Sequence, residues 1–229
     1  MITQAYFIFK AISSEDYLMV NKLPLIIKAK KDIEKIEIEG RDGFLTMDKK
    51  SYRGTIKEVE CTIFSLDDLD FIASWLDGSG DVIFSNEPER VYKATIINQI
   101  PLNKIAWVFH TLLIQFECQP HKYSLSNDII TLTTTPQTIL NSGGAISKPI
   151  IKVFGTGDVD LSINGNIVNL INIVDYVTIN SDLMDCYKDT LLKNNEMSGE
   201  FPILETENNN ISWTGTVTKV EITPNFRYL

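Results

Sequence analysis

The chain has 229 residues, a length that fits one large domain or two small ones. Hydrophobic residues make up 44% of it, enough for packed cores, and charged residues make up 22%, an ordinary share for a globular surface. The formal net charge of −9 argues against a nucleic-acid-binding protein, because binding to phosphates requires clustered lysine and arginine.

Strands dominate the first half of the chain. Residues rich in aromatic and β-branched side chains predict strands at 3–9, 17–20, 56–64, 81–85, 91–97 and 107–118. In the strand 56–64, Val59, Cys61 and Ile63 share one face because side chains alternate across a strand. These strands predict a mostly antiparallel sheet or an open barrel for this half.

A lysine-rich region, 22–35, fits a loop or an extended arm better than it fits a core. After it, Ile36 and Ile38 alternate with glutamates, which predicts a strand that ends at the turn Gly40–Gly43. The following residues, 44–50, are expected to continue this hairpin.

One helix is predicted, over 65–80. Ser65 is a favourable N-cap, and Gly78 and Gly80 are typical of a helix end. A stripe of apolar residues at i, i+3, i+4 and i+7 is expected to face the core, namely Leu69, Ile72, Ala73 and Leu76.

The second half of the chain is predicted to consist of strands and turns. The polar residues 119–128 are the best linker candidate, and the only helical period beyond them lies at 185–192. Within 141–166, glycines and Asp158 are expected to end an apolar strand that begins at Ile150. Asn164-Gly165 predicts a type I′ hairpin turn, and another strand is expected to follow it. This pattern is typical of an antiparallel β-sandwich.

The sequence lacks the motifs of catalytic and cofactor chemistry. His110 and His121, the only histidines, have no metal-ligand spacing, and no serine lies in a Gly-x-Ser-x-Gly elbow. We therefore expect no catalytic residues, no cofactor and no metal site, and a protein that is not an enzyme. Three widely spaced cysteines are expected to be buried thiols rather than a disulfide framework, namely Cys61, Cys118 and Cys186.

No membrane or secretion signal is expected in this sequence. Its first residues lack the features of a signal peptide, and no apolar run approaches the roughly 20 residues that span a bilayer. The sequence thus predicts a soluble protein, made inside a cell and without a membrane partner.

Trp213 is the one candidate for contact with a carbohydrate, because an exposed indole can stack on a sugar ring. A core or strand-end position beside Ile211 is the favoured alternative, since tryptophan is highly buried on average.

Several short motifs follow one another in an order that is typical of a known family. They are Gly40–Gly43, Trp75–Gly78 (WLDG), Glu87–Ala94 (EPERVYKA), Phe116–Pro120 (FECQP), Asn141–Gly165 and Val220–Leu229 (VEITPNFRYL). In this order they resemble the distal tail protein family (Dit) of long-tailed phages, over nearly the whole chain. One departure from the family pattern is Glu207-Asn208, which replaces a Gly-Asn pair.

The resemblance implies a mainly β fold with two domains. Residues 1–126 would form a split β-barrel or sandwich with one α-helix, related to tail-tube proteins, that assembles as a ring. Residues 127–229 would form a galectin-like β-sandwich. No inserted carbohydrate-binding module is expected in a chain this short.

The resemblance also implies a function. The chain would be a structural virion protein at the tip of the tail, a homo-hexameric hub that links the tail tube to the host-adsorption baseplate. Its partners would be the tail tube protein, a tail-associated hub or lysin protein, and baseplate or receptor-binding proteins. DNA would pass through the ring without specific binding. The alternatives are a lectin-like receptor-binding module and a tail-tube adaptor subunit.

Overall fold

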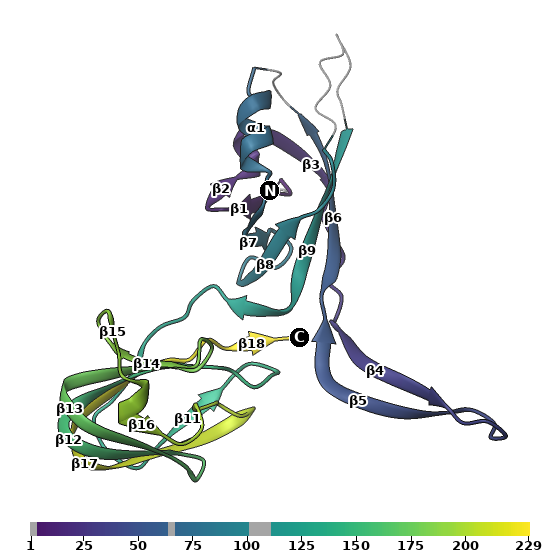
Figure 1. The fold of residues 1–229 in the computed structure, drawn as a ribbon. Coiled ribbons are helices and arrows are strands. Elements are labelled where there is room, and N and C mark those ends of the chain that lie inside the picture. The colour runs from purple at the N-terminus through teal and green to yellow at the C-terminus, as the bar shows by residue number, and fades with distance from the viewer. Residues whose placement is uncertain (1–3, 64–66, 101–110) are drawn as a thin grey trace. The chain divides into compact units, whose positions relative to one another are not determined.

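The computed structural model describes residues 4–63, 67–100 and 111–229 and shows two compact units. Unit 1 spans Met1–Leu125 and unit 2 spans Ser126–Tyr228. Strands dominate both units, and the one α-helix of the described residues lies in unit 1 (Figure 1). The predicted fold class, mainly β with a helix in the N-terminal half, is confirmed. No helix within the described ranges is long and apolar enough to cross a membrane.

The main sheet of unit 1 is antiparallel, with the strand order β2-β1-β7-β8-β9-β6-β3. Its strands are β1 (Phe7–Phe9), β2 (Ile12–Ser13), β3 (Leu18–Lys22), β6 (Thr55–Ile63), β7 (Ser79–Phe84), β8 (Arg90–Ile96) and β9 (Thr111–Ser124). Two further strands, β4 (Lys30–Glu37) and β5 (Phe44–Arg53), form a separate two-stranded sheet. Figure 1 shows this pair as a ribbon that extends away from the start of β6, and we call it the arm.

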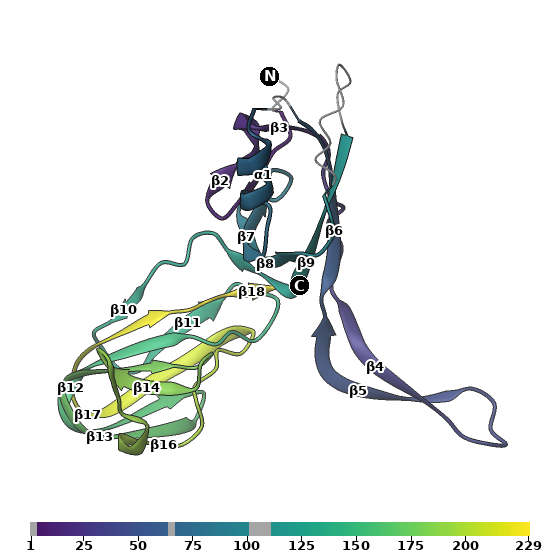
Figure 2. The same cartoon turned by 45° about the horizontal axis from the view of Figure 1, so that its top comes forward.

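The core of unit 1 is built around aromatic side chains from the sheet and the helix. Phe116 in β9 makes edge-to-face contacts with Phe7, Phe9 and Phe84, at ring-centroid distances of 5.5–5.7 Å. Trp75 stacks on Phe7 at 5.6 Å and donates its indole N–H to the carbonyl oxygen of Phe9 at 2.8 Å. These contacts fix the helix against the β1 side of the sheet (Figures 1 and 2).

Helix α1 (Leu69–Trp75) is shorter than the predicted helix 65–80. Its stripe of Leu69, Ile72 and Leu76 is buried as predicted, whereas Ala73 is exposed. Trp75 is the fourth buried side chain of the helix region, and its ring stacks on Phe7 of β1. The predicted N-cap, Ser65, lies outside the described residues.

The prediction of a linker over 119–128 is wrong for its first half. β9 runs on to Ser124, and its last residues pair with β8 beyond an irregularity in the register. Pro120 lies at this irregularity, outside the regular β8–β9 pairs, where a residue without an N–H is tolerated. The polar sequence therefore marks a bulged strand end, and the division between the two units follows Leu125.

The sheet of unit 2 has the strand order β10-β17-β12-β13-β14-β15, with β11 beside β17 and β16 beside β13. Its strands are β10 (Ile130–Leu132), β11 (Gln137–Asn141), β12 (Ile150–Ile163), β13 (Asn166–Asn180), β14 (Asp185–Lys188), β15 (Leu191–Leu192), β16 (Met197–Ser198) and β17 (Glu207–Thr223), and β18 (Arg227–Tyr228) follows near the C-terminus. One continuous set of buried hydrophobic residues, most of them from these strands, forms a second core.

Two local predictions for unit 2 are wrong, and one is confirmed. The glycines after Ile150 do not end a strand, since β12 continues through a bulge between Gly157 and Val159. Residues 185–192 form a tight hairpin, β14–β15, instead of a helix. The hairpin turn at Asn164-Gly165 is present, with φ values of 52° and 86° that fit a type I′ turn.

Glu207 begins β17 with a φ of 72°, in a left-handed region that disfavours side chains with a Cβ atom. Its side chain is exposed, and its carbonyl accepts a hydrogen bond from Asn209 Nδ2 at 3.1 Å, which a glycine would retain. Glu207→Gly should therefore raise the free energy of unfolding of unit 2 by about 0.5–1 kcal/mol in urea. The control Asn208→Gly, at a position with no positive φ, should lower it. A loss of stability in Glu207→Gly would contradict this account.

Candidate interaction surface

The arm is held together by charged side chains that face each other across its two strands. Lys31 contacts Asp48 at 2.5 Å, and two further ion pairs join Glu34 to Lys49 at 3.1 Å and Asp32 to Arg53 at 2.7 Å. The partners are largely exposed, so each pair contributes little to stability, and the three together mainly fix the register of β4 against β5.

One face of the arm is apolar and open to solvent. Ile36 lies directly opposite Leu45, and Met47 follows on the same face opposite Glu34. All three apolar side chains are exposed, as is Ile38 beyond the end of β4. An isolated two-stranded hairpin is marginally stable in water, and no third strand covers this face in the described part of the chain. The arm is therefore a surface suited to contact with another protein.

The segment between β3 and β4, residues 23–29, is a second exposed apolar surface, and we call it the base of the arm. Leu25, Ile26 and Ile27 are 72%, 55% and 60% exposed, while Ala29 is buried. Within the described ranges, neither Ile26 nor Ile27 forms a backbone–backbone hydrogen bond. The base thus presents three apolar side chains together with unpaired backbone groups, the combination that favours pairing with an added strand.

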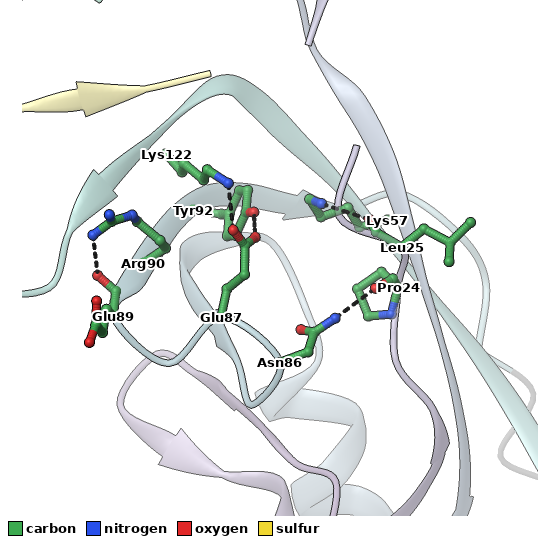
Figure 3. A network of polar contacts seen from close by, with 9 residues as sticks. All are labelled: Pro24, Leu25, Lys57, Asn86, Glu87, Glu89, Arg90, Tyr92 and Lys122. Carbon is green, nitrogen blue, oxygen red and sulfur yellow. Dashed lines mark hydrogen bonds and ion pairs between the residues drawn. The ribbon is translucent and has the colours of Figure 1, made fainter. Parts of the chain in front are cut away.

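Two side chains hold the base from behind (Figure 3). Lys57, in β6, donates to the carbonyl oxygen of Leu25 at 3.2 Å, and Asn86 Nδ2 donates to that of Pro24 at 2.9 Å. Lys57 is only 4% exposed, and its ammonium group lies 4.6 Å from the centroid of the Tyr92 ring. Burial lowers the pKa of Lys57, since the charged form loses its hydration.

A half-buried ion pair stands next to Lys57 in the same cluster (Figure 3). Glu87 contacts Lys122 at 2.5 Å and also accepts a hydrogen bond from the hydroxyl of Tyr92. Burial alone would raise the pKa of Glu87, but the hydrogen bonds from Lys122 and Tyr92 hold it below its ordinary value. Burial and the hydrogen bond to Glu87 raise the pKa of Tyr92. Both tyrosine and carboxylate therefore keep fixed protonation states near neutral pH, and the cluster acts as a rigid support for the base.

The sequence contained a signal for this cluster that our prediction did not use. Position 57 has the same parity as Val59 and Cys61, so Lys57 had to lie on the buried face of its strand. Glu87 and Tyr92 both belong to the motif EPERVYKA, which the family resemblance singled out without assigning a role to either.

The residues singled out for chemistry do not form a site. Trp213 is 9% exposed and belongs to the core of unit 2, which favours the core interpretation, and its contact with a sugar stays an untested prediction. His121 packs edge-on against Tyr52, and His110 lies outside the described residues. Among the described residues, no group of three potential ligands is placed to hold a metal ion.

The three cysteines are buried free thiols, as predicted. Burial raises the pKa of Cys61 and of Cys118 to about 12, and that of Cys186 to about 11. Because the thiolate is the reactive form, none of the three is poised as a nucleophile.

Comparison with known proteins rests on the fold. No family model and no curated protein matches the sequence. A solved structure does match, described as the crystal structure of "SPP1 Dit (gp 19.1) Protein, a Paradigm of Hub Adsorption Apparatus in Gram-positive Infecting Phages". The TM-score is 0.80 at 18% identity, over 98% of this chain and 99% of that one. The chain has the fold of a phage Dit protein. The resemblance found in the sequence is thereby confirmed at the level of the Dit fold, across both units.

Proposed function

We propose that this chain is a structural, non-enzymatic subunit of the distal hub of a phage tail. The observation that carries the proposal is the match to SPP1 Dit over almost the full length of both chains. Because the match includes unit 2, it supports a hub protein over a tail-tube adaptor, which would need only the N-terminal half.

We further propose that six copies form a ring that links the tail tube to the host-adsorption apparatus. The exposed apolar face of the arm and the unpaired backbone of the base support self-association, and a closed ring is one symmetric way to cover them. The expected neighbours are the tail tube protein on one side, and a hub or lysin protein with baseplate or receptor-binding proteins on the other. The net charge of −9 suits a ring through which DNA passes without specific binding.

The mass in solution tests the ring. We expect the full chain to reach about 155 kDa by light scattering at high protein concentration, the mass of six 25.9 kDa copies. Replacement of the apolar arm residues by serine, in Ile36→Ser, Leu45→Ser and Met47→Ser, should give the mass of a single copy, because the surface that drives association is removed.

A matched control removes three exposed apolar side chains from unit 2, by Ile167→Ser, Val174→Ser and Leu191→Ser, and should leave the mass unchanged. A wild-type chain that stays monomeric at every concentration would contradict the ring. A ring that survives the arm substitutions would contradict the role of the arm in its assembly.

A further inference from the structure

The two ends of the arm carry unpaired charges of opposite sign. Between these ends, three cross-strand ion pairs join β4 to β5, while Lys35 and Lys50 form no ion pair with a described residue. Lys28 in the base and Lys30, the first residue of β4 beside it, are exposed, and no carboxylate of the described residues lies within ion-pair distance of either. The base is thus a basic surface as well as an apolar one.

The tip of the arm, residues 37–44, has the opposite charge. Glu37, Glu39 and Asp42 are exposed, and none of them forms an ion pair with a described residue. Two cations accompany them, Arg41 within the tip and Lys35, whose ammonium group lies 4.3 Å from the centroid of the Phe44 ring. Apolar side chains accompany these charges as they do at the base, since Ile38 and Phe44 are both exposed. Base and tip therefore match each other in two ways: each is apolar, and their unpaired charges have opposite signs.

The tip cannot reach the base of its own chain. The two lie at opposite ends of β4, where seven residues of extended strand separate Lys30 from Glu37 by about 23 Å at roughly 3.3 Å per residue. Cross-strand ion pairs and the β4–β5 ladder keep this ribbon extended. A contact between the two surfaces must therefore join two copies of the chain.

We propose that the acidic tip of the arm of one copy binds to the basic base of the arm of the next copy. This inference rests on the proposed ring and names the surfaces that join its subunits. The contact is head-to-tail, because two different patches meet, and head-to-tail contacts close into rings when the rotation permits. In it, Phe44 contacts Leu25–Ile27, while Glu37, which lies opposite Phe44 on the same face of the arm, faces Lys28 and Lys30.

The buried cluster behind the base supports this contact. Lys57 and Asn86 hold the carbonyl oxygens of Leu25 and Pro24, so the base is already in one conformation before a partner arrives. A pre-ordered surface loses less conformational entropy on binding than a mobile loop would lose. The unusual burial of a lysine in this cluster thus has a consequence for assembly.

Two charge-reversal variants of the full chain test the contact. The base variant carries Lys28→Glu with Lys30→Glu, and the tip variant carries Glu37→Lys with Glu39→Lys. In either variant alone, tip and base have charges of the same sign, so the concentration needed for half-assembly should rise at least about tenfold at ~50 mM salt.

An equimolar mixture of the two variants should assemble at nearly the wild-type concentration. In a ring in which the two variants alternate, the acidic tip of the base variant faces the basic base of the tip variant. At the next junction, the basic tip of the tip variant faces the acidic base of the base variant, so every junction pairs opposite charges. Light scattering measures the assembled mass, and labelling of each variant with a different fluorophore shows whether both enter one particle. The control Lys50→Glu with Lys93→Glu has the same net charge as the base variant, but alters neither surface, and should assemble like the wild type.

Each result has one interpretation. If the wild type forms a ring and the base variant assembles just as well, the tip-to-base contact is overturned and the proposed function stands. Loss of assembly in both variants without rescue in the mixture would also overturn it, because the charges would then not face each other. A wild-type chain that never assembles would overturn the ring and this contact together.

Discussion

Ile72→Ala should lower the free energy of unfolding of unit 1 by about 2–5 kcal/mol. Ile72 is fully buried at the centre of the α1 stripe, between Leu69 and Leu76. Alanine removes apolar area from the core and leaves a cavity that the rigid neighbours cannot fill completely. The helix has only seven residues, too few to be stable in water by itself, so its contacts with the sheet are what hold it in place.

Urea unfolding of the full chain, monitored by hydrogen exchange of the β6 and β9 amides, measures this loss of stability in unit 1. Ile56→Ala is the matched control, because Ile56 lies in β6 of the same unit and is exposed. It should change stability by less than about 0.5 kcal/mol. Equal losses in the two variants would mean that the stripe on α1 does not face the core.

The parts of the fold that follow from local sequence were predicted well. Alternation placed Val59 and Cys61 on the buried face of β6, and helical spacing placed Ile72 against the sheet. Asn164-Gly165 fixed a hairpin because few residues tolerate a positive φ at both turn positions. Each of these features depends on residues only a few positions apart.

The features that were missed depend on residues far apart in the chain. Polar sequence around Pro120 was interpreted as a linker, yet the pairing of β9 with β8 carries the strand through it. Residues 185–192 have a helical period, but pairing with the edge of β13 makes them a hairpin. In both cases the ladder of a neighbouring strand overrides the local preference.

The candidate surface was predicted only in outline. An extended arm was one of two expectations for residues 22–35, and the hairpin around Gly40–Gly43 was predicted correctly. That no third strand covers this hairpin is a fact of the whole topology, which spacing cannot reveal. The cluster behind the base brings Lys57, Glu87 and Lys122 together from three separate regions, and no local pattern joins them.

Among single substitutions in the cluster behind the base, removal of the Glu87 carboxylate should cost unit 1 the most stability. Glu87→Ala leaves the ammonium group of Lys122 and the hydroxyl of Tyr92 without their partner in a half-buried place. The loss of one member of such a pair should cost unit 1 about 2–4 kcal/mol of free energy of unfolding at pH 7. Glu89→Ala removes the same chemical group two residues away from an exposed position, and should cost less than about 0.5 kcal/mol.

The pH dependence of the Glu87→Gln variant identifies the charge as the cause. The pKa of Glu87 is lowered in the folded chain, so its carboxylate stabilises unit 1 fully above the unfolded pKa of about 4.3. This contribution is lost as the pH falls through the lower, folded pKa. The difference in stability between the wild type and Glu87→Gln should therefore be constant from pH 6 to 8 and shrink below about pH 4. A difference that stays the same down to acid pH would assign the effect to packing.

The same substitution should also loosen the base of the arm. The negative charge of Glu87 favours the ammonium form of Lys57, and Lys57 holds the carbonyl oxygen of Leu25. Without that charge the buried ammonium group is harder to keep in place, so the base should open more often. Limited proteolysis at residues 25–27 in Glu87→Ala should then be faster than in Glu89→Ala under conditions where both chains remain folded. Equal cleavage rates in the two variants would show that the ion pair stabilises the sheet without fixing the surface that we propose for assembly.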